Sequence, residues 1–266
     1  MNISKKEFKS YFKPFCIYGV ISILFIVMGM TKYVGFSGTN SESMSSLLEG
    51  FPKVFLAMFG MVGVDVDSLS GYYMVLQFYI FIMIALFAVN LAMKVVNEES
   101  QDKTFEFIFT KPVSRSFVLT NKIIPAVFYL MLIALINSLF SKFALNMIDV
   151  DNTINEVIAN SSIYMFLISL VYFSGVLLIC SVCKSVRLST KISYLFFVLT
   201  YIGAFMYQTL DDVRVVKFFT PLQYFTATEV INNDIDSIFI IISIVITIVC
   251  VGCSYMFFSK KDISES

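Results

Sequence analysis

The chain has 266 residues, of which 58% are hydrophobic and only 14% are charged, and its mean hydropathy is +0.83. A soluble domain carries about 25% charged residues, so this composition indicates an integral membrane protein. The formal net charge is zero and histidine is absent, which excludes a basic nucleic-acid-binding surface and removes the commonest metal ligand and general base.

The N-terminal segment indicates an uncleaved first membrane helix. Lysines are spread over residues 1–13, and Pro14 opens an apolar run that we predict to span the membrane at 15–33, because a span needs about 20 apolar residues. No cleavage site typical of a signal peptide follows this run. After an exposed loop at 35–50, apolar residues at helical spacing predict an interfacial helix over 51–66, with a short half-span as the alternative.

Five further apolar runs complete the predicted bundle, and we expect these spans at 71–93, 123–147, 161–182, 192–210 and 236–259. The fourth and fifth spans are joined by a short basic connection, so they should be antiparallel neighbours. An aromatic segment broken by a proline precedes the last span. The predicted fold class is therefore an all-α integral membrane protein with six transmembrane helices in a single domain, 1–266.

The connection at 94–122 is the longest charged stretch between two apolar segments. Thr104 can cap a short helix on which Phe105, Ile108 and Phe109 fall at i, i+3 and i+4 and so share one face. An apolar face of about two turns is not stable alone in water. We therefore expect this helix to lie against the membrane surface or against another protein.

Three residues indicate where this short helix begins and ends and where the next helix starts. Glu106 lies in the first turn after Thr104, where the helix dipole favours a carboxylate. Pro112 ends the helix, because the residue before a proline is disfavoured in the helical region. Ser114 is then a suitable N-cap for the helix that continues into the third span.

The distribution of Lys and Arg predicts that both termini lie in the cytoplasm. With that topology the inner segments hold 14 of the 19 basic residues and the outer segments hold 5. The positive-inside rule favours this arrangement over the inverted one. It also places the 94–122 connection in the cytoplasm. The outer five are Lys32, Lys53, Lys142, Arg214 and Lys217.

The connection resembles the cytoplasmic loop of ABC-2-type transporter permeases. The residues that carry the resemblance are, in chain order, Glu99, Thr104, Glu106, Pro112, Val113, Ser114, Arg115 and Lys122. The sequence departs from the family pattern at Lys103, where a glycine is usual. The order of six apolar segments around the loop agrees with the same family over nearly the whole chain.

The resemblance implies a six-helix ABC-2 permease of the type V exporter-like fold, located in the cell membrane. It implies that the loop is a coupling helix docked on a separate ABC ATPase subunit, and that a second permease subunit, identical or related, completes the transporter. Glu99, Thr104 and Glu106 would then position the loop. Pro112 would form its elbow, and Arg115 would anchor it to the ATPase or to lipid phosphate.

The chain itself lacks the means to bind ATP or to use an ion gradient. The sequence contains no Gly-x-x-x-x-Gly-Lys-Ser/Thr phosphate loop. No Asp, Glu, Lys or Arg lies near the middle of a predicted span, whereas ion-driven carriers usually hold one there. We therefore predict a permease that is not an enzyme and has no cofactor, driven by a partner ATPase. A secondary carrier is the weaker reading.

Two cysteine pairs need a separate interpretation. Cys180 and Cys183, like Cys250 and Cys253, have the spacing of a zinc or redox motif. Both pairs fall within or at the ends of apolar helices, where this spacing places two small residues on one face. We therefore predict helix packing and no metal site.

Polar residues inside the spans are candidates for lining a substrate path. Gln77, Asn137 and Gln208 are the residues for which we make this prediction. The alternative is that they hydrogen bond neighbouring helices together, as polar residues in membrane bundles often do. At the level of function, the alternative is a membrane-embedded sensor, scaffold or immunity protein that binds its ligand without transporting it.

Overall fold

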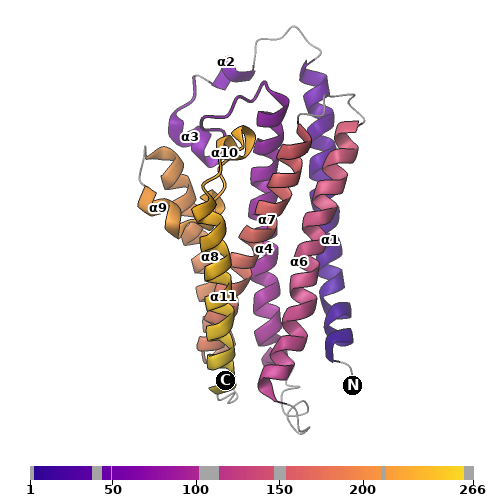
Figure 1. Ribbon diagram of the computed structural model, residues 1–266, viewed down its shortest axis with the longest axis vertical. Helices are drawn as coiled ribbons and strands as arrows, with labels where there is room; N and C mark the ends of the chain where they lie inside the picture. The colour runs from indigo at the N-terminus through magenta and orange to yellow at the C-terminus, as the bar shows by residue number, and fades with distance from the viewer. Residues whose placement is uncertain are drawn as a thin grey trace.

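The computed structural model describes residues 3–37, 44–48, 50–101, 114–146, 154–210 and 214–260. Six long helices dominate this part of the chain (Figure 1): α1 (Ile3–Ser37), α4 (Leu69–Gln101), α6 (Arg115–Asn146), α7 (Ile154–Val182), α8 (Val186–Thr209) and α11 (Ser237–Lys260). Five short elements complete it: α2 (Met44–Leu48), α3 (Lys53–Met58), α9 (Arg214–Phe219), the 3₁₀ turn η1 (Pro221–Gln223) and α10 (Ala227–Asn232).

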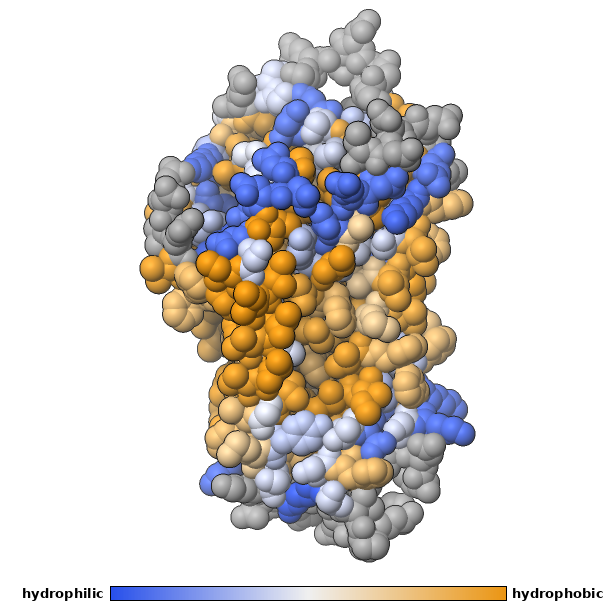
Figure 2. Space-filling view, in the orientation of Figure 1, coloured by the Kyte–Doolittle hydropathy of each residue, from blue (hydrophilic) through white to orange (hydrophobic). Residues whose placement is uncertain are grey.

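All six long helices are long and apolar enough to cross a membrane, which confirms the predicted all-α fold with six transmembrane helices. Each predicted span overlaps one of them. Figure 2 shows the resulting apolar belt between two polar ends of the molecule. Because lipid cannot hydrogen bond to peptide groups, helices that satisfy their own backbone are the expected way to cross this belt.

Helices α4 and α7 form the centre of the bundle. They pack against each other, and 61% of the most apolar window of each is buried, compared with 22% for α8 and 17% for α11. Around this centre, α1 packs mainly on α6, and α11 packs mainly on α7. The exposed faces of α1, α8 and α11 are apolar, as expected for surfaces that contact lipid.

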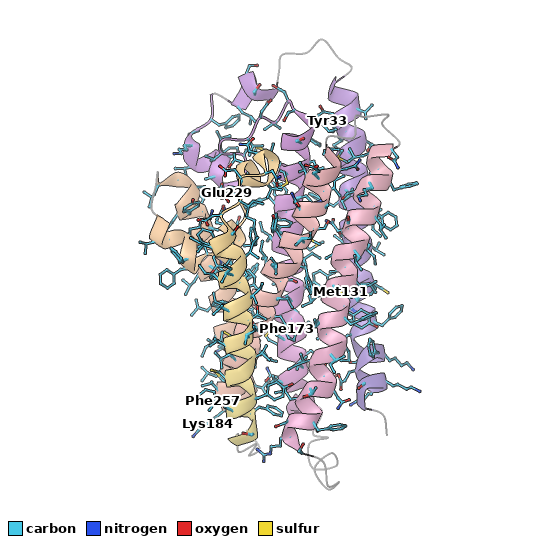
Figure 3. All side chains as sticks on the ribbon, in the orientation of Figure 1. Tyr33, Met131, Phe173, Lys184, Glu229 and Phe257 are labelled. Atoms are coloured by element: carbon cyan, nitrogen blue, oxygen red, sulfur yellow. The ribbon has the colours of Figure 1, made fainter. Side chains whose placement is uncertain are left out.

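Both chain termini lie at the same end of the bundle, which we call the base (Figure 1). The last residues of α4 and the first residues of α6 also reach the base. The short elements α2, α3 and α10 lie at the opposite end, which we call the top. In Figure 3, the labelled Glu229 lies toward the top and Lys184 and Phe257 lie at the base.

Helix α1 begins earlier than the sequence predicted. It starts at Ile3 and continues through Pro14, whereas Pro14 was expected to open the first span. Proline lacks an N–H group, so it cannot hydrogen bond to the carbonyl of Ser10 one turn earlier. The Lys94 side chain donates to that carbonyl instead, with an Nζ to oxygen distance of 2.9 Å. This contact from α4 explains why the helix tolerates an internal proline.

The described parts of the predicted 94–122 connection are helical. Helix α4 continues to Gln101, and α6 begins at Arg115. Ser114 is the N-cap of α6, as predicted, because its Oγ accepts a hydrogen bond from the backbone N–H of Phe117 at 3.3 Å. The early start places Pro125 inside α6, whereas the predicted span at 123–147 would hold this proline in its first turn.

The predicted helix over 51–66 is much shorter in the structure. Only α3 is helical there, with Pro52 as its N-cap. Gly60 and Gly63 have φ angles of +68° and +70°, a conformation that ends a helix and that other residues rarely adopt. A side chain at Gly60 would also meet the ring of Phe78 on α4. Two glycines therefore override the apolar spacing that predicted a longer helix.

Candidate functional site

Most of the predicted coupling helix lies outside the described residues. This applies to Thr104, Phe105, Glu106, Ile108, Phe109 and Pro112. Glu99 lies in the last turn of α4, and Arg115 is the first residue of α6. The structure therefore describes the two helices that hold the predicted loop, and these bring its ends to the base of the bundle.

Arg115 lies at the base against the end of another membrane helix. Its guanidinium Nη1 donates to the carbonyl of Ser259 near the C-terminal end of α11, at 3.4 Å. The carbonyl groups at a helix C-terminus carry partial negative charge, so a cation is favoured there. The residue that the resemblance assigns as an anchor thus contacts this chain's own last helix.

Four charged side chains from three helices gather beside the ends of the predicted loop. We call them the anchor cluster: Glu7 on α1, Lys94 and Glu98 on α4, and Lys122 on α6. The Lys122 Nζ lies 3.9 Å from Glu7 Oε1, and the two side chains are 0% and 1% exposed. Lys94 and Glu98 form a second pair one helical turn apart, with 3.9 Å between Nζ and Oε1.

Hydrogen bonds connect the anchor cluster to backbone and side-chain groups of neighbouring helices. Lys122 Nζ donates to the Val95 carbonyl at 3.2 Å, which joins α6 to α4. Ser10 Oγ on α1 donates to Glu98 Oε1 at 2.9 Å. The buried ring of Tyr11 lies beneath Lys94, with 5.6 Å from Nζ to the ring centroid. A charge out of water needs such partners, because burying it without them is costly.

Gln77 and Asn137 hydrogen bond to each other in the centre of the bundle. Asn137 Nδ2 donates to Gln77 Oε1 at 3.1 Å, and the two residues are 1% and 0% exposed. Gln77 Nε2 donates in turn to the Tyr73 hydroxyl at 2.7 Å, and that hydroxyl donates to Ser141 at 3.1 Å. These contacts favour the packing alternative for both residues, and path lining by them stays a prediction.

Gln208 is placed differently, because it lines a cavity at the top. This cavity has a volume of about 260 Å³, and its polar lining includes Thr226, Thr228 and Glu229. A second, narrower cavity shares Gln208 and reaches Phe78 and Phe81 on α4. Within the described residues, the buried Gln208 Oε1 accepts no hydrogen bond. The structure thus separates Gln208 from the other two candidates.

The segment between α8 and α11 is held together at the top by a further ion pair. Lys217 Nζ on α9 lies 2.5 Å from Glu229 Oε1 on α10, with side chains 4% and 26% exposed. Glu229 also forms a capping box with Thr226. The Lys217 Nζ lies 4.4 Å from the centroid of the Phe239 ring on α11, a cation–π geometry.

Tyr224 and Phe225 fix the turn between the two helices of this top segment. The Tyr224 hydroxyl donates to the Phe218 carbonyl at 2.7 Å, and burial raises its pKa to about 12, so it keeps its proton at neutral pH. Phe225 stacks on Tyr164 of α7, with 4.2 Å between ring centroids. The predicted proline-broken segment is therefore a packed cap on the bundle.

Sequence reasoning did not identify the anchor cluster. Glu7 was not singled out, and Lys122 entered as a basic residue of the loop and of the family resemblance, with no predicted contact to another helix. The spacing of Lys94 and Glu98 is the one local signal, because i and i+4 residues are neighbours on a helix. The contact between α1 and α6 has no such signal, since their hydrogen bonds join residues as far apart as Phe8 and Tyr129, 121 positions along the chain.

A family model described as "ABC-2 family transporter protein" matches residues 1–263. No curated protein matches the chain. The family match covers all six long helices and the segment between α4 and α6.

Proposed function

Because this chain belongs to the ABC-2 family of transporter proteins, a family of membrane-spanning permeases of ABC transporters, we propose that it is the permease subunit of an ATP-driven exporter. Membership of the family implies a partner ABC ATPase and a multi-pass membrane protein. The proposal is that a separate ATPase subunit docks on the 99–115 segment, and that ATP-driven closure of the ATPase rocks the membrane helices.

The docking proposal is supported by the two long helices, α4 and α6, that flank the loop. Helices α4 and α6 extend to the base on both sides of it, and Ser114 caps the first turn of α6. Helices of 33 and 32 residues are about 50 Å long at 1.5 Å per residue, and so exceed a hydrocarbon core of about 30 Å. Helices of this length can carry the described ends of the loop beyond the lipid, where a soluble ATPase can reach them.

The proposed orientation places the base in the cytoplasm of the cell, with the top outside. Both termini, the ends of the predicted loop and Lys184 lie at the base. The predominance of Lys and Arg in the base segments supports this orientation through the positive-inside rule. A reporter fused to the C-terminus that is active only in the cytoplasm tests it, and an active periplasmic or extracellular reporter would contradict it.

We propose that the transport path lies between two permease subunits and opens near Gln208. Gln77 and Asn137 are buried by contacts within one chain. Gln208, in contrast, borders a cavity whose lining combines hydroxyl, carboxylate and apolar groups, and ligand sites in proteins combine apolar lining with a few polar groups in this way. Export is tested in inverted vesicles, where ATP should drive uptake of components from a cell extract, measured by mass spectrometry.

The docking proposal is tested by co-purification of the ATPase from mild detergent. Phe105→Asp with Ile108→Asp places two charges on the predicted apolar face. A matched control, Phe51→Asp with Val54→Asp, makes the same kind of change at the same spacing on exposed residues at the top. We expect the native chain and the control to retain the ATPase and the loop variant to lose it. Size-exclusion chromatography should show that all three chains remain folded.

The result that overturns the docking proposal is equally direct. If no ATPase accompanies the native chain, or if the loop variant retains it, the 99–115 segment is not the docking element. In the first case, the sensor or scaffold alternative gains support, because such a protein does not need a motor. If the Phe105→Asp, Ile108→Asp variant is folded but does not retain the ATPase, the 99–115 segment is the attachment site.

A further inference from the structure

The anchor cluster lies where the predicted loop begins and ends. Glu98 is less than one turn before Gln101, the last residue of α4, and Lys122 is two turns into α6. Lys122 Nζ donates to the Val95 carbonyl at 3.2 Å, so the two sides of the loop are joined directly. A movement of the loop would therefore reach α4 and α6 through the same set of contacts.

Helix α1 is attached to both sides of this junction. Glu7 faces Lys122 of α6 at 3.9 Å, and Ser10 Oγ donates to Glu98 of α4 at 2.9 Å. The Ser10 carbonyl, which Pro14 leaves without its helical partner, accepts from Lys94 at 2.9 Å. The proline thus creates an acceptor on α1 that a charged residue of α4 uses.

Further contacts bind the first three turns of α1 to α6. Ser4 Oγ donates to Asn121 Oδ1 at 2.5 Å, and the Tyr129 hydroxyl donates to the Phe8 carbonyl at 2.8 Å. The Phe8 ring packs edge-on against Tyr129, with 5.8 Å between centroids. These contacts are made at the base, where α1 extends beyond the length needed to cross the membrane.

Stability alone does not explain why charges are used at this junction. Buried ion pairs can often be replaced by apolar residues without loss of stability, whereas separating the two charges leaves each one out of water without its partner. An apolar contact tolerates small sliding movements. A buried ion pair with hydrogen-bonded neighbours favours one relative position of its helices, because only that position keeps the charges together.

We propose that the anchor cluster is a mechanical joint that makes α1 and α6 move as one body when the ATPase displaces the loop. Glu7 and Lys122 are its positioning residues: they hold the base of α1 in register with α6 and take no part in ATP hydrolysis. The joint rests on the proposed function, because it transmits a movement that begins at the docked ATPase. It assigns α1 a transmitting function in addition to that of a membrane span.

The joint is tested in the full complex of permease and ATPase by spin-label distance measurements. Labels on Lys32→Cys at the top of α1 and Ile241→Cys on α11 report movement between two parts of the bundle, in a chain whose five native cysteines are replaced. The distance is compared without nucleotide and after trapping with ATP and vanadate. We expect the native pair to show a nucleotide-dependent change.

The informative variant is Glu7→Leu with Lys122→Leu, which keeps the site packed and removes both charges. We expect it to retain the ATPase and ATP hydrolysis but to lose the distance change at the top. Lys122→Arg, which keeps the charge, should retain the change. As a matched control, Lys217→Leu removes the ion pair at the top, away from the loop, and leaves Glu229 in the cavity lining; it should also retain the distance change.

The possible outcomes separate the joint from the proposed function. A full distance change in the double leucine variant overturns the joint, because charge pairing is then unnecessary for transmission. The joint would also be overturned if the control variant lost the distance change, because removal of any ion pair would then abolish the movement. If the native chain brings down no ATPase, the proposed function fails, and the joint fails with it.

Discussion

Two ion pairs in the described part of the chain, one at each end of the bundle, differ in what they join. At the base, Glu7 and Lys122 come from α1 and α6, two membrane helices far apart in the sequence, and both side chains are essentially inaccessible. At the top, Lys217 and Glu229 are 12 residues apart, in two short helices of one connecting segment. The first pair therefore fixes the packing of the bundle, and the second organises a local cap.

This difference shows where charge contributes to architecture in a membrane protein. The top pair is partly open to solvent and is reinforced by a capping box and by the Phe239 ring. The base pair depends on a carboxylate, an ammonium group and one backbone carbonyl from three helices. Removing one partner should thus have a global effect at the base and a local effect at the top.

The largest effect is expected from Glu7→Leu, which removes the carboxylate that faces Lys122. Leaving a charge out of water after removal of its partner typically costs about 3–5 kcal/mol. We expect a loss of that order in thermal or denaturant unfolding of the chain in detergent. Glu7→Leu combined with Lys122→Leu should recover most of the lost stability, and a single variant as stable as the native chain would contradict the assignment.

The next effect is expected from Glu229→Gln, which removes the charge at the top but keeps a side chain that can accept from Thr226. Lys217 would lose its charged partner, at a cost of about 1–3 kcal/mol. The loss should be local, so hydrogen exchange should increase in 214–232 and remain unchanged in α4 and α7. Faster exchange throughout the bundle would mean that this pair, like the base pair, holds the whole structure.

A smaller effect is expected from Asn137→Leu in the centre of the bundle. Hydrogen bonds between membrane helices contribute about 0.6 kcal/mol on average, so loss of the Gln77 contact should lower stability only slightly. If Asn137 only packs helices together, ATP-driven transport should be unchanged. Transport that falls while stability is preserved would instead establish path lining, the first of our two sequence interpretations.

The smallest effect on stability is expected from Arg115→Ala, because Arg115 lies at the surface of the base. Its contact with the Ser259 carbonyl is exposed, and surface substitutions usually change stability by less than about 0.5 kcal/mol. ATPase retention should nevertheless fall if Arg115 anchors the motor, as the family resemblance implies. Full retention of the ATPase would limit Arg115 to its contact with α11.

The sequence correctly predicted the elements whose cause is local. Long apolar runs identified the six membrane helices, because lipid burial imposes a minimum length on each one. Ser114 was identified as an N-cap from its side chain and position alone. The interfacial helix over 51–66 was predicted too long, because apolar spacing does not report that Gly60 packs against Phe78 with a positive φ angle.

Local rules also misplaced the helix starts near Pro14 and Pro125. Each proline was expected close to the beginning of a helix, where its missing N–H group has no consequence. In the structure both lie inside helices. For Pro14, the carbonyl that would remain unsatisfied is bonded by Lys94 from another helix, a compensation that no rule based on neighbouring residues can anticipate.

The sequence by itself thus determined that the chain crosses a membrane six times and that a charged segment lies between its second and third spans, because composition and apolar length depend only on neighbouring residues. Only the tertiary structure decided which polar groups meet. It paired Gln77 with Asn137, placed Gln208 beside a cavity and brought Glu7 to Lys122. Such pairings depend on which faces of distant helices pack together, and one-dimensional spacing carries no information about that choice.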